Sequence, residues 1–193
     1  MKPIYTLLFF VFFAVAQKNT AQTTTVKSGV YITKEDFKNN RLTEETDCQN
    51  DKETFKKHDF FSKARFTVMR NGKKTTYLKK DIYAYRDCEN SVFRFYNNQE
   101  YEIKEANTIY IYSVRQVIVA EDETDNNPLF YFSNGALGDI KKLSVANLKE
   151  TFPNNKTFHK LLDAQFVAPN IVETYDAAHK TYEVNYLYKQ SVE

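Results

Sequence analysis

The residues in this sequence best suited to proton transfer or metal binding are its three histidines, His58, His159 and His179. Asp176 precedes His179 by three residues, and on a helix this spacing would place the two side chains on one face. Such a pair can transfer a proton or bind a metal ion, but a metal site needs a third ligand and the sequence indicates none. We therefore expect a surface or capping pair, and we predict no catalytic residue, no metal ligand and no cofactor.

Motifs of known enzyme classes are missing from this sequence. It contains no His-Glu-x-x-His, no Gly-x-Ser-x-Gly and no Cys-x-x-Cys. An acidic segment before Pro128 has the oxygen ligands that calcium prefers: Glu121, Asp122, Glu123 and Asp125. Because this segment lacks the spacing of a calcium-binding loop, we expect a solvated loop there instead.

Charge is distributed unevenly along the chain. Residues 52–80 contain ten Lys or Arg and two acidic residues, whereas residues 81–140 contain four basic and eleven acidic residues. A basic hairpin in the first segment is a candidate surface for an anionic envelope component, such as an acidic polysaccharide or a membrane surface. The alternative, which we favour, is that neighbouring strands pair these charges across a sheet. The candidate patch consists of Lys63, Arg65, Arg70, Lys73, Lys74, Lys79 and Lys80.

Tyrosine and phenylalanine are abundant, with 14 and 16 copies, while tryptophan is absent. Aromatic residues favour strands. Six tyrosines fall in the segments with strand patterns and are candidates to line a groove for a sugar or a peptide: Tyr83, Tyr85, Tyr96, Tyr101, Tyr110 and Tyr112. A core or half-buried sheet face is the more common role of such residues, and we favour it.

The first residues have the pattern of a signal peptide. Lys2 precedes an apolar stretch of about 13 residues, which is shorter than the roughly 20 that span a bilayer. The stretch ends in Ala14-Val15-Ala16, a signal-peptidase pattern, and a second site follows Ala21. We predict a signal peptide over 1–16, with 21 as the alternative end, and a mature chain that is periplasmic or secreted. A retained anchor is disfavoured, and no later stretch reaches transmembrane length. Because the mature chain is nearly neutral, we expect no binding of nucleic acid.

The two cysteines, Cys48 and Cys88, are expected to form a disulfide, because an exported chain meets an oxidising compartment. Closing a loop of this length stabilises the fold by roughly 4 kcal/mol in the chain-entropy model. Two separate buried thiols are the alternative.

Strand patterns dominate from Phe61 to Phe132. Alternation around Phe66 and Val68 leads into an Asn71-Gly72 turn. Further strands are predicted at 74–78, 81–85, 92–96, 100–103, 109–112, 117–119 and 129–132. Before this region, the sequence predicts a short helix capped by Thr33, with Asp36 at its third position, and a loop or frayed turn over 47–57. Six to eight short strands imply an antiparallel meander, either a curved sheet or a partly open barrel.

Helical periodicity begins after Gly135. Ser144 is predicted to cap a helix that Pro153 ends, and Phe158 begins the apolar stripe of a second helix. A third helix is predicted from Asn170 through Tyr182, with the tail as its extension or as an edge strand. We therefore predict one α+β domain over 22–193, with strands mainly to 134 and two to three helices over 135–193.

Several segments resemble uncharacterised exported proteins of Bacteroidota, over most of the mature chain. In the C-terminal part they are Leu143–Lys149, Phe152–Asn154, Phe158–Leu162, Tyr175-Asp176, His179-Lys180 and Val184-Asn185. In the N-terminal part they are Gly29–Thr33, Glu35–Phe37, Ile82–Arg86 and Phe93-Arg94, with Ala84 where the family commonly has glycine. The resemblance implies export and a single unit, and it carries no known activity or site.

These observations predict a non-enzymatic envelope or secreted protein with a binding or structural role, whose partner is an anionic envelope component or another envelope protein. The alternative is a hydrolase whose site is assembled from residues distant in sequence.

Overall fold

A computed structural model gives the structure of residues 26–49, 53–56, 64–114, 128–167 and 172–193, with the backbone alone for 53–56. Several predicted features lie outside these residues: the signal peptide, His58, Lys63, the strand at 117–119, the acidic segment at 121–125 and the helix cap at Asn170.

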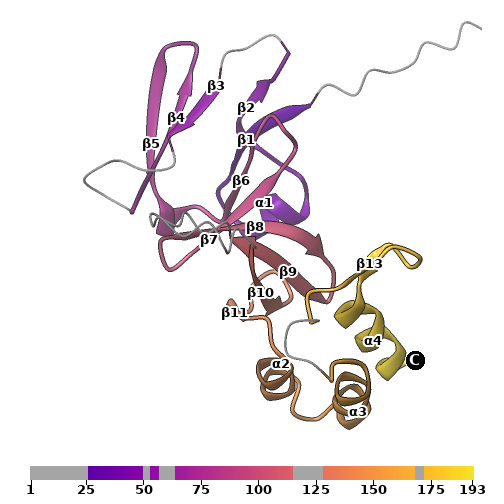
Figure 1. Ribbon diagram of the computed structural model, residues 1–193. Helices are drawn as coiled ribbons and strands as arrows, with labels where there is room; N and C mark the ends of the chain where they lie inside the picture. The colour runs from indigo at the N-terminus through magenta and orange to yellow at the C-terminus, as the bar shows by residue number, and fades with distance from the viewer. Residues whose placement is uncertain (1–25, 50–52, 57–63, 115–127, 168–171) are drawn as a thin grey trace, which may run out of the picture.

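An open antiparallel sheet of eight strands forms the centre of the molecule (Figure 1). Its strands, in spatial order, are β11 (Lys141–Lys142), β10 (Leu129–Asn134), β9 (Ile109–Val114), β8 (Gln99–Ala106), β7 (Val92–Tyr96), β6 (Ala84–Arg86), β1 (Lys27–Tyr31) and β2 (Thr43–Asp47). From β6 to β11 the order follows the chain, while the β1–β2 hairpin adds to the edge of β6. The predicted antiparallel meander is therefore confirmed.

Asparagine-based turns set the register of two hairpins, as the sequence indicates. Asn71 and Gly72 have φ of 46° and 80° between the neighbouring strands β4 (Arg65–Arg70) and β5 (Lys73–Leu78). Asn97 and Asn98, at 50° and 62°, connect β7 to β8. Positive φ at both central residues gives a turn whose twist matches that of the flanking strands.

A second sheet consists of β3 (Glu53–Lys56), β4 and β5, and it packs on the N-terminal half of the large sheet (Figure 1). Phe66 of β4 lies with its ring centre 4.7 Å from that of Tyr85 and 5.1 Å from that of Phe95. The buried cluster between the two sheets is made by Val30, Phe66, Val68, Ile82, Tyr85 and Phe95.

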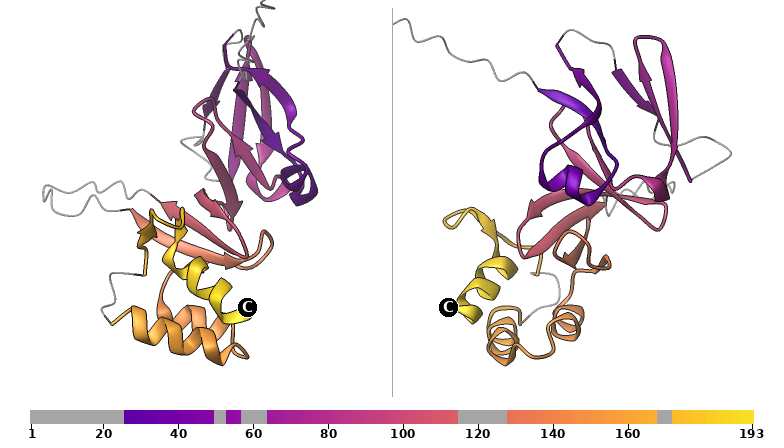
Figure 2. Two further views of the ribbon diagram at one scale, coloured as in Figure 1. Left: turned by 90° about the vertical axis from the view of Figure 1, so that its right-hand side faces the viewer. Right: turned by 180° about the vertical axis from the view of Figure 1, so that it is seen from behind.

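Three helices pack on the other half of the large sheet, at β9 and β10 (Figure 2). They are α2 (Val145–Thr151), α3 (Lys156–Gln165) and α4 (Glu183–Val192). Ser144 caps α2 as predicted, and Asn155 caps α3. Ile109, Ile111 and Phe132 of the sheet meet Leu148, Phe158 and Leu162 of the helices in one cluster. Among the described residues, no helix has the length and apolar character needed to cross a membrane.

The helix predicted from Asn170 to Tyr182 is wrong over the described part of that range. Residues 175–182 form a hairpin of β12 (Tyr175–Asp176) and β13 (Thr181–Tyr182), and α4 starts only at Glu183. The Asp176 carboxylate accepts the backbone N–H groups of Ala178 and His179, and Lys180 has a φ of 54°. An aspartate bonded to the backbone two residues on favours a turn over a helix.

Two further expectations are corrected. The loop predicted over 47–57 contains the strand β3, which pairs with β4. The strand predicted at 81–85 begins only at Ala84, because residues 79–81 form the 3₁₀ helix η1 (Lys79–Asp81). By contrast, the predicted short helix is confirmed as α1 (Lys34–Lys38), with Thr33 as its cap.

The predicted disulfide is confirmed. Cys48 and Cys88 are bonded, with Cα atoms 5.5 Å apart, which lies within the usual range for a disulfide. The bond joins the residue after β2 to the turn between β6 and β7.

Candidate functional site

A pocket of about 620 Å³ lies where the start of α1, the helix η1 and the end of β7 meet. This volume is within the range of small-molecule sites. Four basic and two acidic side chains line it, together with tyrosines and aliphatic residues. The lining comprises residues 32–35, 79–83 and 94–98 and Leu137.

Arg94 lines this pocket from the sheet face that also carries Tyr96, Tyr101 and Tyr112, which we call the tyrosine-rich face. Arg94 is buried, with 5% of its surface exposed. Its Nη1 donates to Tyr112 Oη at 2.8 Å and to Ser133 Oγ at 3.4 Å. Its Nη2 donates to the carbonyl oxygen of Gly138 at 3.1 Å. Its Nε is buried and has no hydrogen-bond partner among the described residues. All three acceptors are neutral groups.

Aromatic rings surround the guanidinium. The Arg94 Cζ atom lies 5.4 Å from the ring centre of Tyr83, 5.5 Å from that of Tyr96 and 5.9 Å from that of Tyr112. Burial raises the pKa of Tyr83 and of Tyr112 above the usual value, although the Arg94 charge acts in the opposite direction. These phenols are therefore neutral near pH 7 and supply no negative charge to Arg94.

No carboxylate of the described residues forms an ion pair with Arg94. A buried ion without an opposite charge costs several kcal/mol of desolvation. Cation–π contacts with the three rings offset part of this cost. Arg94 is thus a fixed positive charge in a pocket, with a donor left over.

Lys79 is a second buried cation at the same end of β7, with 2% of its surface exposed. Its Nζ lies 5.4 Å from the ring centre of Phe95 and donates weakly to the Asn98 carbonyl at 3.4 Å. Burial lowers the pKa of Lys79, and the charge of Glu100 opposes that shift. Because successive residues of a strand face opposite sides, the Arg94 and Lys79 charges flank β7 from its two faces.

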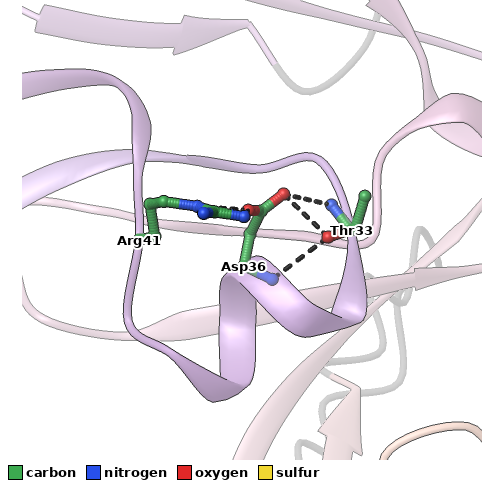
Figure 3. Close-up of polar contacts among 3 residues, drawn as sticks. All are labelled: Thr33, Asp36 and Arg41. Carbon is green, nitrogen blue, oxygen red and sulfur yellow. Dashed lines mark hydrogen bonds and ion pairs between the residues drawn. The ribbon is translucent and has the colours of Figure 1, made fainter.

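The start of α1 forms one rim of the pocket and is held rigidly by a capping box (Figure 3). Asp36 Oδ2 accepts from the N–H and the hydroxyl of Thr33, at 2.9 and 2.8 Å, while the Asp36 N–H donates to Thr33 Oγ1. Arg41 Nε donates to Asp36 Oδ1 at 2.7 Å. The bonds from Thr33, followed by those from Arg41, lower the pKa of Asp36. This carboxylate is fully engaged beside the pocket.

The loop after β10 forms another wall. The Tyr83 hydroxyl donates to the Ala136 carbonyl at 2.8 Å, and the Tyr96 hydroxyl donates to Asp139 Oδ1 at 3.0 Å. At Gly138, an added Cβ would lie 2.6 Å from the Asn134 oxygen, so only glycine fits there. The loop is therefore fixed to the sheet by the same tyrosines that surround Arg94.

The predicted basic patch is divided by the structure. Arg70 lies opposite Lys73, and Met69 opposite Lys74, next to the hairpin turn, whereas Arg65 lies opposite Leu78 at the far end of β4. Five strand steps, or about 17 Å, separate these ends. Lys79 and Lys80 follow β5 and line the pocket, while Lys63 is outside the described residues. The structure thus brings two of the seven patch residues to the pocket.

The two described histidines have structural contacts. His159 Nε2 lies 2.9 Å from the Phe152 carbonyl oxygen. His179 Nδ1 lies 2.5 Å from Asp176 Oδ2, and its ring stacks on Tyr186 with centres 4.0 Å apart, beside a second pocket of about 470 Å³. The predicted capping pair is thus present in a turn. No group of three or more metal-binding side chains occurs within the described ranges.

The six candidate tyrosines do not share one surface. Tyr83, Tyr96 and Tyr112 surround Arg94, whereas Tyr85 is fully buried against Phe66 on the other face. Sequence reasoning overlooked Arg94 as a site residue. The available signal was an arginine in the middle of the apolar strand at 92–96, where a buried position is expected and a charge is costly.

Comparison with protein-family models, with curated proteins and with solved structures finds no match for this chain.

Proposed function

We propose that this chain is an exported, non-enzymatic binding protein that takes a small anionic ligand in the pocket at Arg94. The observation that carries this proposal is the burial of a guanidinium, 5% exposed, without any carboxylate partner among the described residues. A bound anion would supply the missing charge and accept from the unpaired Nε–H.

Export is supported by two features. The segment before Gln17 has the composition of a signal peptide. The disulfide between Cys48 and Cys88 is the kind of bond that persists in oxidising compartments. The resemblance to exported proteins of Bacteroidota also supports the proposed export. An anionic envelope component is the corresponding source of ligand.

Anion binding is tested on the purified mature chain by thermal unfolding at low ionic strength, with acetate, benzoate, phosphate and sulfate. A ligand that binds only the folded state stabilises it by RT ln(1 + [L]/Kd), about 2.7 kcal/mol at a concentration of 100 Kd. At least one anion should raise the Tm in proportion to the logarithm of its concentration, and Arg94→Gln should lose this response. A wild type whose Tm no anion shifts would contradict the proposal.

Arg86 provides the matched control. It belongs to β6 on the same sheet face, since Ala84 lies opposite Arg94 and Arg86 is two residues further along. It stacks on Tyr31 and its Nη2 donates to Asn40 Oδ1 at 2.7 Å, outside the residues that line the pocket. Arg86→Gln should retain the anion response. Secretion is tested separately, by sequencing the N-terminus of exported material, which should begin at Gln17 or Gln22.

A hydrolase is the second candidate function, and the contact between His179 and Asp176 beside the second pocket favours it. A carboxylate that orients an imidazole is one part of a general-base site. Hydrolysis of p-nitrophenyl esters by the wild type, with loss of turnover in His179→Ala, would support this candidate. Equal rates for the two proteins would reject it.

A further inference from the structure

We infer that the ligand of the Arg94 pocket is a monocarboxylate with an apolar or aromatic body, whose carboxylate binds the Nε–Nη2 edge of Arg94. This inference rests on the proposed anion-binding function and specifies its ligand class. Three properties of the pocket lead to it: the donors that Arg94 retains, the charge of the pocket and the apolar residues at its mouth.

The retained donors of Arg94 match a carboxylate. A guanidinium has five N–H donors. Nη1 donates to Tyr112 and Ser133, and Nη2 donates to Gly138. The Nε–H has no partner among the described residues, and Nε and Nη2 form one edge of the planar group. Two parallel donors on such an edge fit the two oxygens of a carboxylate.

The hydroxyl groups next to Arg94 cannot add further donors. The Ser133 hydroxyl donates to the Gly135 carbonyl at 2.7 Å, so its oxygen accepts from Tyr112 at 2.8 Å. The Tyr83 hydroxyl is directed to Ala136. A phosphate or sulfate presents three or more acceptor oxygens and would find too few donors on this face of the sheet.

The charge of the pocket favours a single negative charge. Lys34 is paired with Glu35 at 3.3 Å, and Lys79 lies on the other face of β7 with its pKa lowered by burial. Lys80 and Asp81, both exposed, add one charge of each sign to the lining. Because Arg94 is the only fixed buried charge on the tyrosine-rich face within the described pocket lining, one carboxylate neutralises it, whereas a dianion would leave an excess.

The mouth of the pocket suits an apolar body. Leu137 is 57% exposed and lines the pocket. Ile32, Tyr83 and Tyr96 line the same space. An aryl or branched alkyl group attached to the carboxylate would cover Leu137 and stack on a tyrosine ring.

Calorimetric titration of the full mature chain tests this inference with four probes: 3-phenylpropionate, its amide, acetate and inorganic phosphate. We expect 3-phenylpropionate to bind at least tenfold more tightly than acetate and than phosphate. The amide, which has the same body without the charge, should bind at least 50-fold more weakly than the acid.

Variants separate the carboxylate contact from the apolar contact. Arg94→Lys keeps the charge but loses the paired donors, and should weaken binding of 3-phenylpropionate at least tenfold. Leu137→Glu changes an exposed residue, so the fold should be kept, and the added charge should weaken the same binding at least tenfold. Leu137→Ala should weaken the binding of 3-phenylpropionate about threefold and leave the binding of acetate unchanged. Arg86→Gln should behave as the wild type.

Phosphate binding more tightly than 3-phenylpropionate would overturn the carboxylate assignment and leave the proposed anion-binding function intact. Equal binding of the acid and the amide would also overturn it. If no anion binds, both the inference and the proposed function fail.

Discussion

The Arg94 cluster and the His179 cluster each place a basic side chain against tyrosine, and they are built in different ways. The His179 cluster is local, because Asp176 and Tyr186 lie within seven residues of the histidine. The Arg94 cluster is long-range, since its hydrogen-bond acceptors are 18, 39 and 44 residues away in sequence. The first is exposed at a hairpin turn, and the second is buried inside the sheet's tyrosine-rich face.

The difference lies in what each cluster leaves unsatisfied. Asp176 accepts two backbone N–H groups and the histidine Nδ1–H, so its contacts explain the turn in full. Arg94 retains a buried donor and a charge without a counter-ion in the described chain. A candidate binding site is therefore indicated by the unsatisfied cluster, although the histidine and aspartate are the residue types more often linked to catalysis.

The disulfide lies outside both clusters and gives the largest expected effect on stability. Replacing Cys48 and Cys88 by serine should lower the free energy of unfolding by about 4 kcal/mol, because a loop with a sequence separation of 40 is no longer closed in the unfolded chain. Urea unfolding measures this change. At temperatures where the variant is folded, it should bind 3-phenylpropionate as the wild type does. A loss of binding in the folded variant would show that the Arg94 site depends on the disulfide.

Alanine substitution compares the two clusters directly. Arg94→Ala should lower the free energy of unfolding by about 2–3 kcal/mol, since it removes a buried stem and three hydrogen bonds that connect β7 to β9, to β10 and to the loop at Gly138. His179→Ala should lower it by less than about 1 kcal/mol, as for other exposed ion pairs. Denaturant unfolding of both variants measures the two losses of unfolding free energy. A larger loss for His179→Ala than for Arg94→Ala would contradict the difference between the two clusters.

Hydroxyl deletions give a smaller, matched pair. The Tyr112 hydroxyl accepts from Arg94 and donates to Ser133, so Tyr112→Phe should cost about 1 kcal/mol of unfolding free energy. Tyr186→Phe keeps the ring that stacks on His179 and should leave the Tm almost unchanged. Differential scanning calorimetry measures the Tm of both variants. Equal losses of stability would contradict a special role for the buried hydrogen bonds of Tyr112 with Arg94 and Ser133.

The smallest effect concerns pH. The hydrogen bond from His179, and then the backbone bonds, lower the pKa of Asp176 below its ordinary value of 3.8. The folded state therefore holds this proton less tightly than the unfolded state. The contribution to stability is present above the ordinary pKa and is lost as pH falls through the lowered one.

Asp176→Asn should accordingly be less stable than the wild type at pH 7, and the gap should narrow below about pH 4. Unfolding curves from pH 7 to pH 2 measure this difference in stability. A difference that grows as the pH falls would contradict a lowered pKa of Asp176.

Local signals in the sequence predict much of the fold. Thr33, Ser144 and the asparagine turns mark helix starts and hairpins because their side chains or φ angles act within a few residues. The strands β2 and β3 are polar, and their pairing depends on partners elsewhere in the chain. The helical spacing at 171–182 was overridden by the Asp176 turn.

The candidate site could be predicted far less well. Arg94 gains its surroundings from Tyr112, Ser133 and Gly138, which come together only when β7 to β10 pair in register. Lys79 was included in a patch of exposed charges, yet it is buried, because η1 turns it against Phe95. The contacts of neither residue follow from local spacing.

The position of the disulfide has a mechanical consequence. Cys48 and Cys88 enclose all of β3, β4 and β5, so the second sheet lies inside a covalently closed loop. Tension applied between the two ends of the chain passes through the sulfur atoms and bypasses that sheet. In single-molecule pulling, about 13 nm of contour length stays hidden in the oxidised protein and is released on reduction. The second sheet, β3 to β5, therefore bears no force as long as the disulfide is intact.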